Sequence, residues 1–219
     1  MNLELFDVGD NSDDSVLTLA PGAVVLHGFA RPNDTALFEA VKLVSAEAPF
    51  RHLVAPGSNS LKMSVAMTNC GTRGWFSDRH GYRYVTVDPI SGKPWPGMPG
   101  IFKSLARNAA AAAGFEDFQP EACLINRYQP GARLNLHQDK DENDYTQPIV
   151  SVSLGLPATF LFGGLERTDK QTRVPLVHGD VVVWGGPSRL RFHGVKPVKD
   201  GNHELLGAQR INITFRRAG

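Results

Sequence analysis

The segment "RLNLHQDKDEND", residues 133–144, carries the pattern on which the expected fold and chemistry depend. It begins by alternating Leu134 and Leu136 with polar residues, which is the period-two pattern of a half-buried strand. Residues i and i+2 of a strand project from one face, so His137 and Asp139 are expected on the same side. An imidazole and a carboxylate that converge form a ligand pair for a divalent metal such as Fe(II). A second histidine would complete a facial set that leaves coordination positions open.

The second histidine must come from another part of the chain. His193 in "RFHGVKP" (191–197) is the best placed, on an expected later strand. His178 and Asp180 in "HGD" have the same spacing as His137 and Asp139, but Gly179 and the following apolar run predict a turn that enters a strand. An isolated H-x-D pair is more often an ordinary hydrogen-bonded or surface pair than a metal site, so the spacing alone leaves both interpretations open.

The chain around this segment is rich in short β-type segments from about Ala122 onward. They are bounded by Gly or Pro and predict a sandwich or barrel. In addition to residues 133–139, the expected strands are "ACLINRY" (122–128), "IVSVSLGL" (149–156), "TFLFGG" (159–164), "VVVWGG" (181–186) and "RINITFR" (210–216). The segment "DKQTRVP" (169–175) is expected to be a loop.

The first half of the chain contains two expected helices. Residues 33–49 open with the capping candidates Asn33 and Asp34, repeat apolar residues at helical spacing and end at Pro49. Residues 100–115 place an apolar stripe on one side and end near Gly114. Between them, residues 86–100 are dense in Pro and Gly, which predicts a long surface loop. The fold class expected is mainly β with flanking helices (α+β).

Length and composition restrict the class of protein. The 219 residues suit one domain with a proper core, and 42% hydrophobic residues suit a globular chain. No apolar run is long enough to span a bilayer, and the acidic start lacks the features of a secretory signal, so no membrane partner and a cytoplasmic location are expected. Cys70 and Cys123 are too few for a disulfide framework and have no zinc-binding spacing. The net charge of +1 favours no partner.

Residues 62–84 combine positive charge with aromatic rings. Four basic residues stand against Asp78 alone, and Trp75, Phe76, Tyr82 and Tyr84 are interleaved with them. Cations beside exposed rings suit a nucleic-acid strand, because phosphates attract charge and unstacked bases need a flat face. A solvated loop with a few core aromatics would have the same composition, and this segment alone favours that simpler interpretation.

The C-terminal segment "RINITFR" alternates strictly. One face would be apolar and the other would carry two arginines. An edge strand with its polar face in water is the ordinary interpretation. If the apolar face packs on helices, the polar face instead turns into the barrel, where two guanidiniums require anions, and a small dicarboxylate would satisfy them. The polar face consists of Arg210, Asn212, Thr214 and Arg216.

Together these segments resemble a known family. Residues 126–144, 151–164, 178–195 and 210–216, with "AMTNCGTRGW" (66–75), are similar to the AlkB family of Fe(II)- and 2-oxoglutarate-dependent dioxygenases, which repair alkylated nucleic acids. The resemblance runs from about Pro21 to Ala218. It implies one domain, 1–219, with a double-stranded β-helix (jelly roll, cupin-like) catalytic core in 122–219, and with N-terminal helices and a nucleotide-recognition lid in 1–121.

The resemblance also implies the site residues. Fe(II) would be held by the catalytic residues His137, Asp139 and His193, with 2-oxoglutarate and O2 as co-substrates. Residues of two strands would contact 2-oxoglutarate, without an assignment of each arginine to a carboxylate: Asn126, Arg127, Tyr128, Arg210, Asn212, Thr214 and Arg216.

A further set would bind the substrate, an N-alkylated base such as 1-methyladenine or 3-methylcytosine, flipped out of DNA (preferably single-stranded) or RNA. Trp75 would stack on the base opposite His137, and Asp141 would contact the exocyclic amine. Without the resemblance, Asp141 would be interpreted as a solvated or turn-capping acid and Trp75 as a core aromatic. The other implied contacts are Met67, Tyr82, Arg83, Tyr84 and Arg167.

The chain is expected to act as a monomer, oxidising the methyl group with release of formaldehyde. Three other functions stay open at this stage. A zinc hydrolase could use two histidines and an aspartate, although it would need a general base. A 2-oxoglutarate oxygenase acting on protein or a small molecule would share the core and differ in the lid. A non-catalytic jelly-roll binding module would tolerate loss of either histidine. The preference for DNA or RNA and the ranking of lesions are not determined by the sequence.

Overall fold

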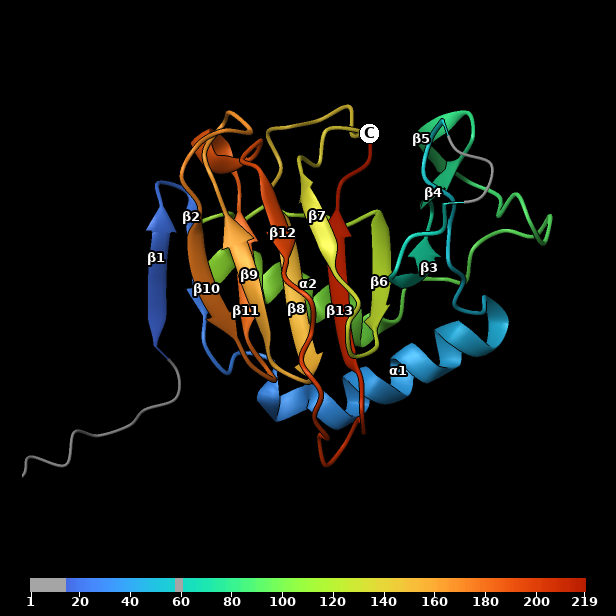
Figure 1. The fold of residues 1–219 in the computed structure, drawn as a ribbon, viewed down its shortest axis with the longest axis horizontal. Helices are drawn as coiled ribbons and strands as arrows, with labels where there is room; N and C mark the ends of the chain where they lie inside the picture. Colours follow the sequence, from blue (N-terminus) through green and yellow to red (C-terminus); the bar gives the residue numbers. More distant parts are fainter. Residues whose placement is uncertain (1–14, 58–60) are drawn as a thin grey trace, which may run out of the picture.

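The computed structural model describes residues 15–57 and 61–219, and its core is two facing antiparallel sheets (Figure 1). In spatial order, the larger sheet contains β1 (Val16–Ala20), β2 (Ala23–Leu26), β11 (Val181–Trp184), β8 (Ile149–Gly155), β13 (Arg210–Arg216), β6 (Ala122–Tyr128) and β3 (Ala66–Gly71). The smaller sheet contains β10 (Thr172–Leu176), β9 (Ala158–Phe162), β12 (His193–Val195) and β7 (Leu134–His137). A separate hairpin joins β4 (Gly74–Asp78) and β5 (Gly81–Val85). The mainly β class with flanking helices is therefore confirmed.

Two α-helices cover the outer face of the larger sheet. Helix α1 (Asp34–Glu47) begins after Asn33, the N-cap residue, whose side chain makes no capping hydrogen bond, and α2 (Gly100–Ala112) begins after Pro99. Their apolar stripes pack in one cluster with the apolar face of β13, and the rings of Phe102 and Phe215 meet edge to face at 5.8 Å. Both helices were predicted within a few residues of their observed ends. The short 3-10 helices are η1 (Arg31–Asn33) and η2 (Gly186–Ser188).

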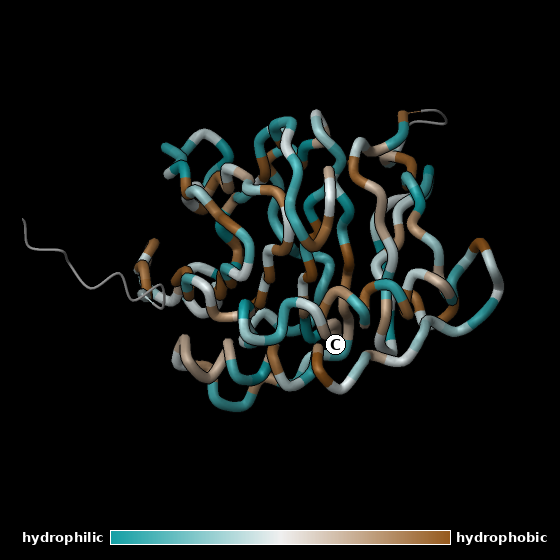
Figure 2. Tube along the Cα trace, turned by 90° about the horizontal axis from the view of Figure 1, so that it is seen from below, coloured by the Kyte–Doolittle hydropathy of each residue, from teal (hydrophilic) through white to brown (hydrophobic). Residues whose placement is uncertain are grey.

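A second apolar cluster fills the space between the two sheets. It includes Phe160 and Phe162 of β9 and Trp184 of β11. Hydrophobic and hydrophilic residues are interspersed along the chain trace (Figure 2), and they alternate strictly along β13, as expected when successive side chains point to opposite faces. The larger sheet is thus covered on one face by helices and on the other by the smaller sheet, and β13 lies near its middle.

The expected loop at 169–175 is wrong for its second half, because β10 occupies residues 172–176. Val174 and Leu176 are buried whereas Thr172, Arg173 and Pro175 are exposed. As an edge strand β10 pairs only with β9, so a proline without an N–H group is tolerated there. The Pro in the segment and its short length concealed the alternation.

The segment 86–100 lacks a helix or strand apart from Gly100, as predicted, but it is not entirely at the surface. Trp95, Met98 and Asp88 are buried, and the indole Nε1 of Trp95 donates to the Val85 carbonyl oxygen at 3.0 Å. This loop therefore packs against the β4–β5 hairpin.

The first half of the chain also contributes strands to the larger sheet. β2 pairs with β11 and β3 pairs with β6, so residues before 122 extend the sheet that carries the site. The division of function at residue 122 stays a prediction. Within the described ranges, none of the helices has the length and apolar character needed to cross a bilayer.

Candidate metal and co-substrate site

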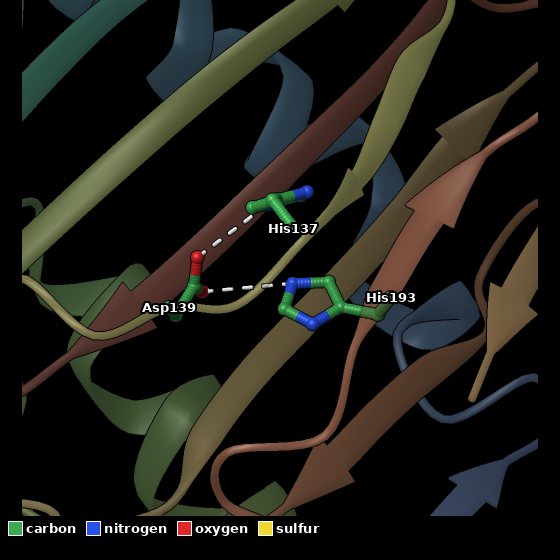
Figure 3. A group of neighbouring side chains, drawn as sticks. All are labelled: His137, Asp139 and His193. Carbon is green, nitrogen blue, oxygen red and sulfur yellow. Dashed lines mark ion pairs between the residues drawn. The ribbon is translucent and has the colours of Figure 1, made fainter. Parts of the chain in front are cut away.

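Three predicted metal ligands meet at one end of the smaller sheet (Figure 3). His193 of β12 is the direct cross-strand partner of His137 of β7, and the centroids of the two imidazole rings are 4.4 Å apart. Asp139 Oδ1 lies 3.5 Å from His137 Nε2, and Asp139 Oδ2 lies 3.8 Å from His193 Nε2. The ligand atoms of all three residues lie within 4.8 Å of one another. Two imidazoles and a carboxylate on one side of a point suit Fe(II).

Backbone carbonyls orient both imidazoles. His137 Nδ1 lies 2.9 Å from the Asn135 carbonyl oxygen, and His193 Nδ1 lies 3.0 Å from that of Arg191. A carbonyl oxygen only accepts, so each Nδ1 carries a proton, and the neutral form of each ring has its lone pair on Nε2. The Nε2 atoms are those that face Asp139. This arrangement prepares both rings as metal ligands before a metal arrives.

Asp139 lies beyond the regular part of the strand. β7 ends at His137, so the strand geometry that predicted convergence does not extend to this residue. Instead Arg216 holds it, since Nε and Nη2 of Arg216 both donate to Asp139 Oδ2, at 2.8 and 2.6 Å. The expectation of proximity is confirmed for a different reason from the one that the sequence suggested.

The charges in this cluster shift the acidities of the three ligands. Burial would raise the pKa of Asp139, but Arg216 and the two histidines hold this pKa well below its usual range. Burial and then His137 lower the pKa of His193 to about 4. Burial would lower the pKa of His137, but its bond to Asp139 outweighs this effect and raises the pKa. At neutral pH the cluster therefore offers an ionised carboxylate and a neutral His193.

The polar face of β13 turns inward. This is the arrangement expected from the sequence if the apolar face of the strand packs on helices. All four side chains of that face are buried. Asn212 donates to Ser151 Oγ and to the Val152 carbonyl oxygen, and Thr214 donates to Asn212 Oδ1. Asn126 of β6 donates to Asn212 Oδ1 at 3.2 Å. The interior of the barrel thus has a polar wall.

Arg210 lacks an anion. Arg210 is 2% exposed, Nη2 donates to Ser153 Oγ at 3.0 Å, and Nε and Nη1 have no hydrogen-bond partner among the residues that the structure describes. Its guanidinium lies 5.0 Å from the centroid of the Tyr128 ring. A buried cation with free donors is costly unless a ligand supplies the missing acceptors. A carboxylate of 2-oxoglutarate would do so, and the residues therefore fit this co-substrate.

The two arginines are not equivalent in their partners within the protein, and the expected contact of each with 2-oxoglutarate stays a prediction. Arg216 already faces Asp139 and also lies 3.3 Å from Glu142 Oε1. Of the two arginines of β13, Arg210 is the one with fully buried nitrogens that lack a hydrogen-bond partner.

The structure does not place the side chain of Arg127 with this group. Arg127 opposes Ile211 across β6 and β13, and directly opposed residues share a face. Its guanidinium lies 4.6 Å from the centroid of the Phe50 ring, beside the helix-covered cluster. Alternation along β6 directs this side chain to the other face while Asn126 and Tyr128 face the interior, so this geometry gives no support to the implied contact of Arg127 with 2-oxoglutarate, which stays a prediction.

The β4–β5 hairpin, which we call the lid hairpin (residues 74–85), carries an aromatic pair. The rings of Trp75 and Tyr82 stack with centroids 5.2 Å apart. The indole Nε1 of Trp75 donates to Asp141 Oδ2 at 2.8 Å. Three implied substrate contacts are therefore brought together from two distant parts of the sequence.

The other implied substrate contacts have partners within the protein. Arg83 donates to both carboxylate oxygens of Asp78, at 2.9 and 2.7 Å, so its charge is already balanced. The hydroxyl of Tyr84 donates to Glu142 Oε1 at 2.6 Å. Arg167 is exposed, with its guanidinium 5.7 Å from the centroid of the Phe192 ring, and Met67 is buried between the sheets.

Two buried residues at the site escaped the sequence analysis. Glu142 and Arg189 are 4% and 2% exposed and form an ion pair at 3.1 Å. Glu142 was visible only as one acid among several after Asp139, and Arg189 only as a basic residue four positions before His193. The sequence did not indicate that these two residues are buried, because charged residues at such positions are ordinarily solvated.

The second H-x-D pair has a structural role. His178 Nε2 lies 3.0 Å from Asp34 Oδ2, and Asp180 accepts hydrogen bonds from the amides of Gly28 and Val177. These bonds tie the turn before β11 to the start of α1. Among the described residues, the cluster with metal-ligand geometry is that of His137, Asp139 and His193.

Comparisons with known proteins agree with this geometry. Residues 22–216 match the model of the 2OG-Fe(II) oxygenase superfamily. The chain is 58% identical over 200 residues to the alpha-ketoglutarate-dependent dioxygenase AlkB of Salmonella typhimurium, covering 91% of this chain and 92% of that protein. It is 57% identical over 201 residues to the protein of the same name from Escherichia coli, covering 92% of each. The solved structure of OsALKBH1 superposes with a TM-score of 0.79 at 31% identity, covering 93% of this chain and 100% of that one.

Proposed function

The chain belongs to the 2OG-Fe(II) oxygenase superfamily and requires Fe(II), 2-oxoglutarate and O2, and on this premise we propose that it oxidatively removes alkyl groups from base nitrogens of nucleic acids. The observation that carries the proposal is the meeting of His137, Asp139 and His193 in a barrel whose interior also contains an arginine without an anion. A metal-binding fold that only holds an ion would have no use for that second feature.

The residues of the barrel bind and orient the co-substrate. When bound, Fe(II) and 2-oxoglutarate supply the oxidation of an unactivated C–H bond by O2, with loss of carbon dioxide from the keto acid. Arg210 would hold a carboxylate of 2-oxoglutarate through Nε and Nη1, while Ser153 accepts from Nη2. Asn126, Asn212 and Thr214 line the wall between the two arginines of β13. His137, Asp139 and His193 hold the metal.

The lid hairpin and Asp141 recognise the base. Tyr82 stacks against Trp75, and a flipped base would stack on the opposite face of the indole. Asp141 uses Oδ2 to accept from Trp75, which leaves Oδ1 for an exocyclic amine. A carboxylate at this place favours cationic bases such as 1-methyladenine and 3-methylcytosine over neutral ones. The methyl group is then oxidised and leaves as formaldehyde.

A single strand is the preferred substrate in this proposal. A base must leave its stack to enter the site, and this costs least in a strand that is already unpaired. The lid hairpin carries few basic residues that are free of acidic partners, which supports weak binding rather than a clamp on a duplex. The chain acts as a monomer in the cytoplasm, where nucleic acid is accessible. DNA and RNA strands both satisfy this chemistry.

The test separates metal and co-substrate binding from turnover. Fe(II) and 2-oxoglutarate are added without oxygen, and a visible charge-transfer band is expected. Oxygen and a single strand containing 1-methyladenine are then added, and formaldehyde is measured.

His137→Ala should lose both signals. His178→Gln, which changes the other H-x-D pair, should keep both once thermal unfolding shows that it is folded. Folded protein that gives the band without formaldehyde would refute nucleic-acid demethylation, and folded protein that gives neither signal would refute the oxygenase assignment of the site.

A further inference from the structure

The carboxylate ligand of the metal site lies in a segment without regular structure. Residues 138–148 connect β7 to β8 and contain no helix or strand. They carry Asp139 and also Asp141, the proposed base contact. A ligand in such a loop keeps its geometry only if contacts from outside the loop hold the backbone.

Arg189 makes these contacts. Its guanidinium is 2% exposed, and three different nitrogens donate to three different residues of the loop. Nη1 donates to the Asp139 carbonyl oxygen at 2.7 Å, Nη2 to Glu142 Oε2 at 3.1 Å, and Nε to the Gln147 carbonyl oxygen at 3.0 Å. The planar, rigid fork of an arginine can hold three acceptors at once, which a lysine cannot do.

The position of Arg189 joins the two segments that carry the metal ligands. It follows η2 directly and stands four residues before His193. Its own amide donates to the Gly186 carbonyl oxygen, and Ser188 Oγ donates to the Pro21 carbonyl oxygen at 2.8 Å. The side chain thus reaches from an anchored turn beside His193 to the backbone of Asp139.

Glu142 extends this set to the lid hairpin and to β13. Besides Arg189, it accepts from the Tyr84 hydroxyl at 2.6 Å and lies 3.3 Å from Arg216 Nε. Two arginines and two carboxylates, with Asp139 as the second acid, therefore balance in charge within the protein. Buried pairs of this kind contribute little net stability compared with apolar side chains of similar volume. Their geometry, rather than their energy, is what the site uses.

We propose that Arg189 is a positioning residue of the metal centre, which fixes the Asp139 carbonyl and the 138–148 loop so that the Asp139 carboxylate meets His137 and His193. It acts through Asp139 and touches neither metal nor substrate. The proposal rests on the proposed function only in taking a divalent metal as the occupant of the site, and its test needs no nucleic acid.

The test measures metal affinity in the full chain. Co(II) is titrated into metal-free protein under anaerobic conditions, and its visible absorption is followed. Arg189→Met should bind Co(II) about 10- to 100-fold more weakly, which is the usual effect of losing a group that orients a metal ligand. Arg189→Lys should recover only part of the loss, because an ammonium cannot reach all three acceptors.

Two further variants separate positioning from general damage. Arg51→Met breaks another partly buried pair, since Arg51 Nη1 lies 2.7 Å from Asp88 Oδ1, and it should lower stability while leaving Co(II) affinity unchanged. The double variant Arg189→Met with Glu142→Gln neutralises the carboxylate that has lost Arg189. It still lacks the hydrogen bond to the Asp139 carbonyl oxygen, so its affinity for Co(II) should stay low.

The proposal is overturned if folded Arg189→Met binds Co(II) as tightly as the parent. It is equally overturned if the double variant regains the parent affinity, since the loss would then come from the uncompensated charge of Glu142. These results are independent of demethylation. A parent protein that releases no formaldehyde, combined with weak Co(II) binding by Arg189→Met, would refute the substrate and retain the positioning role.

Discussion

Replacement of Arg210 by Met should make the ligand-free protein more stable while weakening 2-oxoglutarate binding. Nε and Nη1 of this buried guanidinium lack partners, and each such donor costs about 1–3 kcal/mol. The change removes one hydrogen bond to Ser153, which contributes about 1.5–3 kcal/mol. The difference predicts that the free energy of unfolding rises by roughly 0.5–3 kcal/mol, because Met is of similar size and carries no charge.

The same change should be severe for the co-substrate. Removing one partner of a buried, hydrogen-bonded charge pair costs about 2–5 kcal/mol, which is roughly 30-fold to several-thousand-fold in the dissociation constant. Both effects can be read from denaturant unfolding with Mn(II) as a redox-stable metal, with and without 2-oxoglutarate. A ligand present at a hundred times its dissociation constant for the parent should stabilise the parent by about 2.7 kcal/mol and the variant by less than about 1 kcal/mol.

Arg216→Met is the matched control on the same strand, and the expected sign is opposite. Arg216 pairs with Asp139 and Glu142. Its loss leaves the buried Asp139 carboxylate without an arginine, while Glu142 keeps Arg189, and should lower the free energy of unfolding by about 3–5 kcal/mol. If Arg210→Met lowers stability as much as Arg216→Met, or leaves 2-oxoglutarate affinity unchanged, the interpretation of Arg210 as a guanidinium that lacks its anion is wrong.

Three other predictions concern the base, the ionic strength and the pH. Trp75→Ala should raise the KM for a methylated strand about 5- to 150-fold, since stacking contributes about 1–3 kcal/mol per base. Trp75→Phe should keep most of that stacking and lose only the hydrogen bond to Asp141. Equal kinetics for the two variants would contradict a stacking role. Apart from Arg83, which is paired with Asp78, the segment 62–84 contains three basic residues. Raising the salt concentration from about 50 to 200 mM should therefore weaken single-strand binding about 15- to 20-fold. An affinity that salt does not change in a filter-binding assay would exclude phosphate contacts there. Burial and then His178 lower the pKa of His203 below its usual value of 6.5 in the folded protein. The unfolded chain therefore binds the proton more readily, and the free energy of unfolding, which is full above pH 6.5, falls as the pH drops through that value toward the lower folded pKa. Urea unfolding of His203→Gln should show a smaller decline between about pH 7 and 5, and an unchanged decline would assign the effect to other groups.

Much of the β core was predictable because its signals are local. Alternation in "RINITFR" and the apolar runs of β6, β8 and β11 depend only on neighbouring residues and the period of a strand. The five strands before residue 86 escaped prediction, as did β10. β3 contains Asn and Gly, and β10 contains Pro, so their composition argues against strands that only pairing with β6 and β9 makes favourable.

The metal set was predictable only in part from such local signals. His137 and Asp139 are close in the sequence, whereas the place of His193 opposite His137 depends on the pairing of β12 with β7. The order of the motifs and their resemblance to a known family supplied the rest.

The sequence by itself determined which residues could take part: the two helices, the strands of the second half, the three metal ligands and the polar face of β13. Only the tertiary structure decided their partners, giving Arg216 two carboxylates, leaving Arg210 without one, turning Arg127 to the helix side and burying Arg189 against the Asp139 loop. The physical reason is that side-chain direction follows from the local backbone, whereas charge compensation and desolvation depend on groups brought together from distant segments of the chain.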